Sequence, residues 1–67
     1  MRDNRAERLS ARQEQAIVAL INETTIAAAS RASGIGQRTL HRWVSEPEFL
    51  AAYRAARREA FSHAIAL

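Results

Sequence analysis

The sequence predicts an all-α protein, a small bundle of about four helices that ends in an extended C-terminal helix. Apolar residues recur at the three- and four-residue spacings of helices, and no segment shows the strict alternation of strands. The chain also has no internal repeat and no low-complexity linker, so short connections are expected. Its 67 residues are enough for one domain with a small core.

The first helix is expected over residues 10–22, after a charged N-terminal arm of residues 1–9. Ser10 is followed three residues later by Gln13, which is the spacing of a capping box at a helix start. The inward stripe of this helix consists of Ile17, Leu20 and Ile21. In the arm, three arginines alternate with two acids, which favours a solvated tail over an arm that lies in a DNA groove. These residues are Arg2, Arg5, Arg8, Asp3 and Glu7.

Two short helices follow, at residues 26–33 and 37–45, and Gly34 separates them. A glycine there predicts a backbone with positive φ that ends the earlier helix. Ile35 is expected to fill the turn with its apolar side chain. Gly36 stands at the N-cap of the later helix, where Ser, Asn or Asp is commoner but Gly is tolerated.

The fourth helix is expected over residues 47–66, because Pro47 fits a first helical turn and neither Gly nor Pro follows it. The segment Ser45-Glu-Pro-Glu48 matches a Ser-x-x-Glu capping box. An apolar stripe on this helix is formed by Phe49, Tyr53, Ala56, Ala60 and Ala64, widened by Leu50 and Phe61. This stripe exceeds what a short three-helix unit covers, so we expect self-association through the C-terminal helix; the alternative is that the first helix covers the whole stripe.

The helix at 37–45 has one apolar and one polar side when it is drawn at about 100° per residue. Leu40 and Trp43 fall on the apolar side, where a core position for Trp43 is favoured over stacking on a base. The polar side consists of Arg38, His41, Arg42 and Ser45, with Gln37 at its edge. Two short helices around a glycine turn, the second with separated faces, are typical of a DNA-reading helix-turn-helix.

The distribution of charge supports the same interpretation. The formal net charge is +3, and the arginines and acids cancel in residues 1–23 and in residues 46–67. The excess therefore lies on Arg31, Arg38 and Arg42, within a window that contains no acid. Such a concentrated positive field attracts a polyanion, so double-stranded DNA is the expected partner.

The expected contacts divide between bases and phosphates. Base edges in the major groove are assigned to Gln37, Arg38 and His41. Phosphates are assigned to Arg42, Arg31, Ser45 and Thr25, the last through its hydroxyl and the free N–H groups of a helix N-terminus. The competing interpretation is an ordinary solvated helix face.

The segment Ala27-Ala-Ala-Ser-Arg-Ala-Ser-Gly-Ile-Gly-Gln-Arg-Thr-Leu-His-Arg-Trp-Val44, followed by Glu46-Pro-Glu-Phe-Leu50 and Tyr53, resembles the helix-turn-helix domains of bacteriophage small-terminase-like proteins and related prophage regulators. The resemblance covers residues 9–60. It implies DNA recognition at a phage packaging site, with transcriptional regulation as the alternative. It matches Gly34 to the turn glycine, Leu40 and Trp43 to the buried pair, and Arg38 and Arg42 to the basic face. Gly36 and His41 depart from the pattern, since Ser and Tyr are more usual there.

Other function classes find little support in the sequence. Cysteine is absent and the two histidines, His41 and His63, are far apart, so we expect no metal and no cofactor. Glu46 and Glu48 lie near His41, but no nucleophile accompanies them, and an enzyme is not expected. A helical protein-interaction module without DNA binding is the better rival.

The cellular location is expected to be the bacterial cytoplasm or that of a phage-infected host. The N-terminal residues lack the apolar stretch of a signal peptide. The longest apolar run, residues 16–21, is far shorter than the roughly 20 residues that cross a bilayer. No membrane association is therefore expected.

Overall fold

The computed structural model describes residues 9–65, with side chains up to residue 63. The regular elements among these residues are all helices: α2 (Ala11–Asn22), α3 (Ile26–Ser33), α4 (Gln37–Val44) and α5 (Pro47–Ile65). The predicted all-α fold class, with four helices and an extended last helix, is confirmed. Within the described residues the predicted helix limits differ from these by at most one residue.

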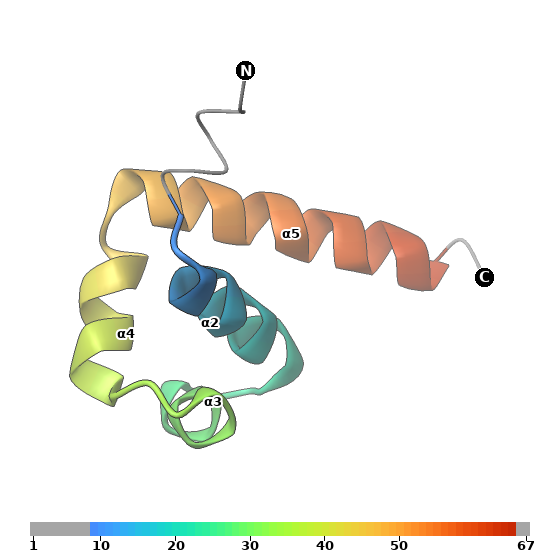
Figure 1. Cartoon of the computed structure of the whole chain (residues 1–67). Coiled ribbons are helices and arrows are strands. Elements are labelled where there is room, and N and C mark those ends of the chain that lie inside the picture. Colours follow the sequence, from blue (N-terminus) through green and yellow to red (C-terminus); the bar gives the residue numbers. More distant parts are fainter. Residues whose placement is uncertain (1–8, 66–67) are drawn as a thin grey trace.

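The other three helices surround α2 on three sides (Figure 1). Helix α5 runs along the top of the view, α3 lies at the bottom, and α4 stands at the left and joins them. α2 packs against both α3 and α5, and α4 also packs against both of them. α4 is therefore held between the other elements at the edge of the molecule.

The core is small and combines three alanines with four larger apolar side chains. Its buried members are Ala16, Ile17, Ala19, Ala29, Ile35, Leu40 and Phe49. Ile35 fills the turn, as predicted, and the three alanines let α2 and α3 approach closely. Of the predicted stripe on α2, Ile17 is buried, whereas Leu20 and Ile21 are half-buried and pack against the core.

The predicted capping box at the start of α2 is confirmed. The Gln13 N–H donates to the Ser10 hydroxyl oxygen at 3.1 Å, and the Ser10 N–H donates to the Gln13 side-chain oxygen at 3.0 Å. The prediction for Leu9 was wrong, because this residue packs against the core and does not belong to a solvated arm. The five charged residues of the arm lie outside the described residues.

The capping box predicted at Ser45 was wrong. Ser45 has helical dihedral angles (φ −92°, ψ −5°), and its hydroxyl donates to the carbonyl oxygen of Arg42 at 2.7 Å. It thus closes α4, which ends at Val44 and not at the predicted Ser45. The carbonyl of Glu46 accepts the first bond of α5, from the Leu50 N–H at 2.9 Å, which leaves Pro47 at the first helical position.

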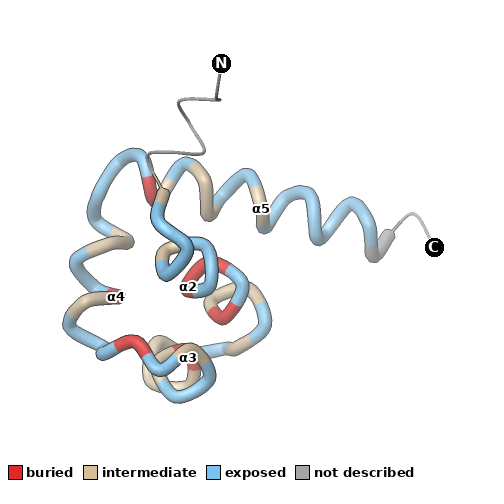
Figure 2. Tube along the Cα trace, viewed as in Figure 1, coloured by how far each residue is buried: buried red, intermediate tan, exposed pale blue. Residues whose placement is uncertain are grey.

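Helix α5 is covered only along its first half (Figure 2). Phe49 is buried, Tyr53 and Ala56 are half-buried, and Ala60 and Phe61 are exposed. Helix α2 therefore does not cover the whole predicted stripe of α5. The side chain of Ala64, the last residue of this stripe, lies outside the described part. None of the helices in the described residues has the length and apolar character needed to cross a membrane.

Candidate nucleic-acid interface

The turn between α3 and α4 begins at Gly34, which has φ 76° and ψ 10°. Its N–H donates to the carbonyl oxygen of Ser30 at 2.8 Å and ends α3. No atom lies within 4 Å of the place that a Cβ would occupy, so backbone conformation alone selects glycine at this position. The predicted positive φ is thus confirmed.

Two serines of α3 hold the rest of the turn. The Ser30 hydroxyl donates to the carbonyl oxygen of Ile35 at 2.6 Å. The Ser33 hydroxyl donates to the carbonyl oxygen of Ala29 at 2.7 Å and accepts the Ile35 N–H at 3.2 Å. These bonds fix the start of α4 relative to α3. The sequence interpretation missed them, although serines one and four residues before a turn glycine are a signal for such bonds.

The inner face of α4 is anchored as predicted. Leu40 is fully buried, and Trp43 is half-buried against the core. The Trp43 ring lies 5.8 Å from the Phe49 ring, centroid to centroid, with 36° between their planes. Gly36 precedes the helix with φ −61° and makes no side-chain cap bond. Contacts to α3 and α5 thus determine the orientation of α4.

The outer face of α4 carries the polar residues that the sequence assigned to it. All five are exposed: Gln37, Arg38, His41, Arg42 and Ser45. Arg38 and Arg42 are one helical turn apart, so their guanidinium groups leave the helix on the same side. Among residues 9–63, neither of them forms an ion pair with a carboxylate, and neither does Arg31. Their charges are not neutralised by that part of the chain.

The remaining candidates, Arg31, Thr25 and Ser45, differ in whether a side-chain hydrogen remains to donate to a phosphate. Arg31 is exposed in the last turn of α3. Thr25 caps the start of α3, where its hydroxyl oxygen accepts the Ala28 N–H at 3.0 Å and its hydroxyl hydrogen remains to donate. The one hydroxyl hydrogen of Ser45 is already donated to Arg42, so Ser45 must break that bond before it can donate to a phosphate.

Two hollows in the described part of the chain lie away from α4. One lies between α2 and α3 and the other between α2 and α5, and no residue of α4 lines either of them. No group of three potential metal ligands occurs among the described residues. His41, Glu46 and Glu48 are all exposed.

Comparisons with protein-family models, with curated proteins and with solved structures find no match to this chain.

Proposed function

We propose that this protein binds duplex DNA with α4 in the major groove. The observation that carries the proposal is the outer face of α4, which is exposed, basic and free of acids, while its inner face is anchored in the core. A helix with its side chains is about 10 to 12 Å in diameter, and the major groove is about 12 Å wide, so the groove can admit α4.

In this arrangement the residues have separate tasks. Arg38 donates two hydrogen bonds to a guanine edge, Gln37 pairs with an adenine, and His41 contacts a neighbouring base. Phosphates are contacted by Arg42 and Arg31 and by the hydroxyl of Thr25, which position the helix without reading sequence. Ser45 contacts a phosphate only after rotation of its hydroxyl.

The biological role that we propose is recognition of phage or prophage DNA in the bacterial cytoplasm. The resemblance of residues 27–53 to small-terminase-like proteins supports recognition of a packaging site. A transcriptional regulator would use the same contacts, and sequences selected from random duplex DNA would distinguish the roles by where they occur in a phage genome.

Titration of a labelled duplex at several salt concentrations tests DNA binding. Each phosphate contact adds roughly −0.9 to the slope of log K against log salt, so loss of the phosphate contacts of Arg31 and Arg42 should make the slope less negative by about 2. We expect this loss for R31A/R38A/R42A. The matched control is R54A/R57A/R58A, which removes the same charge from α5, on another part of the molecule. Both variants are titrated at a protein concentration at which the free protein is monomeric, so that only contacts with DNA are compared.

Equal losses for the two triple variants would indicate a nonspecific charge effect and would contradict the proposal. Absence of salt-dependent binding by the unaltered protein would favour the rival, a helical protein-interaction module.

A further inference from the structure

Val18 on α2 and Phe61 on α5 are the large apolar side chains most exposed to solvent in the described residues, at 57% and 66%. Each lines one of the two hollows. Neither belongs to the surface assigned to DNA. Their exposure has a cost in water that contact with an apolar partner would remove.

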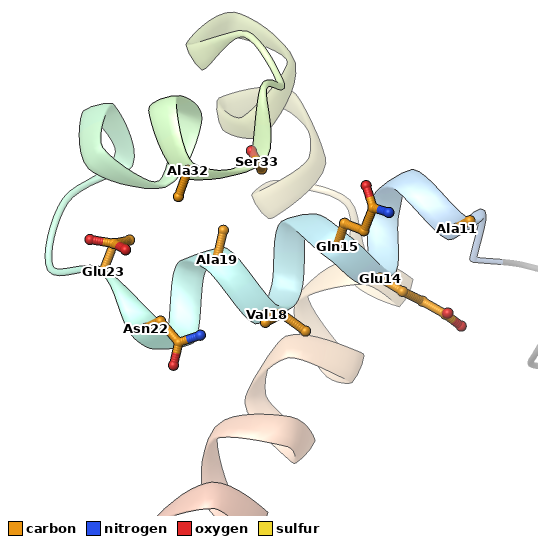
Figure 3. A pocket seen from close by; sticks show the side chains of 9 residues that line it. All are labelled: Ala11, Glu14, Gln15, Val18, Ala19, Asn22, Glu23, Ala32 and Ser33. Carbon is orange, nitrogen blue, oxygen red and sulfur yellow. The ribbon is translucent and has the colours of Figure 1, made fainter.

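The hollow that contains Val18 has a volume of about 540 Å³ and lies between α2 and the end of α3. Figure 3 shows Ala19 of α2 and Ala32 of α3 pointing toward each other across it. Its charged lining residues are Glu14 and Glu23, and no basic residue lines it. We call this region the acidic hollow.

The hollow that contains Phe61 has a volume of about 490 Å³ and lies between α2 and the second half of α5. Its apolar lining is formed by Ile21, Ala60 and Phe61, and its charged lining by Arg54, Arg57 and Arg58. No acid lines it. We call this region the basic hollow. The two hollows thus have opposite charge and share one feature, a prominent apolar side chain.

The two hollows cannot meet within one chain. Both are bordered by α2, one on the side of α3 and the other on the side of α5. Because α2 packs against both of these helices, bringing the hollows together would require the core to come apart. A second copy of the chain, by contrast, can present its basic hollow to the acidic one.

We propose that copies of this protein associate head to tail, the acidic hollow of one copy receiving the exposed half of α5 of another. Phe61 packs beside Val18, and the arginines of the basic hollow pair with Glu14 and Glu23. Opposite charge sets the orientation and excludes contact between like hollows. A head-to-tail pair keeps one free hollow of each kind, the acidic hollow on one copy and the basic hollow on the other, so assembly continues past a dimer or closes into a ring.

No residue of α4 lines either hollow, so the outer face of α4 stays accessible in every copy. The inference does not depend on DNA binding, since it concerns the free protein. Should the protein also bind DNA, two copies would supply two recognition helices, as helix-turn-helix proteins commonly do.

Sedimentation equilibrium at tens of micromolar tests the contact. We expect the unaltered protein to form species heavier than a monomer, and both Val18→Asp and Phe61→Asp to weaken association about tenfold or more, a change of about 1.4 kcal/mol. Ala55→Asp is the control, because Ala55 is exposed on α5 and lines neither hollow. It should associate like the unaltered protein.

Mixing the two variants gives the sharper result. Each variant retains the hollow that the other has lost, so an equimolar mixture should contain a dimer with a single contact. A monomeric unaltered protein, or a mixture that stays monomeric, would overturn the proposal.

Charge reversal provides a second, independent pair of variants in case an apolar substitution unfolds the chain. E14R/E23R and R57E/R58E should each be monomeric alone. Their mixture should associate again, because each variant retains the unaltered hollow that the other has lost, and the two altered hollows also have opposite charge. Association of either variant alone as strong as that of the unaltered protein would equally overturn the proposal.

Discussion

Arg38 and Arg42 occupy the same face of α4 but opposite ends of the helix, the first turn and the last. In helix-turn-helix proteins the N-terminal residues of the recognition helix reach the base edges. Arg38→Ala should therefore weaken binding to the preferred duplex by about 1 to 3 kcal/mol and relax the preference at one base pair. Arg42→Ala should weaken binding to all duplexes alike. Titrations against the preferred and a scrambled duplex measure both effects.

Equal losses on the two duplexes for Arg38→Ala would contradict its assignment to a base. A loss for Arg42→Ala confined to the preferred duplex would exchange the roles of the two arginines.

The sequence predicted which side chains lie on the inner face of α4 and which on its outer face, because burial follows the helical period directly. It was less informative about hydroxyl groups. Ser33 and Ser45 donate to carbonyl oxygens four and three residues earlier in the chain, whereas Ser30 donates forward to Ile35 in the turn. A serine hydroxyl can cap a helix, close a helix or bind a phosphate, and the local pattern is compatible with each.

At the scale of elements, the α3–α4 turn depends on the positive φ of Gly34. Gly34→Ala should lower the free energy of unfolding by about 1 to 2 kcal/mol, because a Cβ is disfavoured in the left-handed region. Gly34→Asn should cost less, since asparagine tolerates that region. Urea unfolding followed by helical circular dichroism compares them. If both variants lost the same stability, the cause would be side-chain contact and not backbone strain.

The start of α5 shows how an element boundary escapes prediction. The Ser-x-x-Glu spacing at Ser45 favoured a capping box, but Ser45 continues the helical backbone of α4 and bonds backward. Two helices separated by so few residues compete for the same capping serine. The proline then determines where α5 begins, because its fixed φ suits the first helical position.

At the scale of the whole molecule, stability depends on a few large side chains. A domain of 67 residues has about 3 to 10 kcal/mol of stability in total. Trp43→Ala removes the ring that packs on Phe49 and should cost about 3 kcal/mol, the lower end for an aromatic core residue because Trp43 is only half-buried. Phe61→Ala is the control and should change stability by less than about 0.5 kcal/mol.

Both variants are compared by urea unfolding at low protein concentration, where association is weak. A folded Trp43→Ala protein of unchanged stability that fails to bind DNA would mean that the ring faces the nucleic acid.

The overall architecture could be predicted because periodic apolar residues, caps and turn glycines all indicated the same four helices. The length of α5 that other helices cover could not be predicted, because it depends on the length of α2 and on how the two helices pack. The apolar stripe along α5 looked uniform in sequence, yet only its first half found a partner within the chain.

The attachment of α4 at both ends has a kinetic consequence. Serine bonds from α3 hold its start, and the contact of Trp43 with Phe49 holds its end. The helix cannot tilt without moving α3 and α5 together. A surface fixed before encounter needs no slow rearrangement after collision, so the rate of DNA association would be set by diffusion and by long-range attraction to the arginines. Discrimination between sites would then appear in how long each complex lasts.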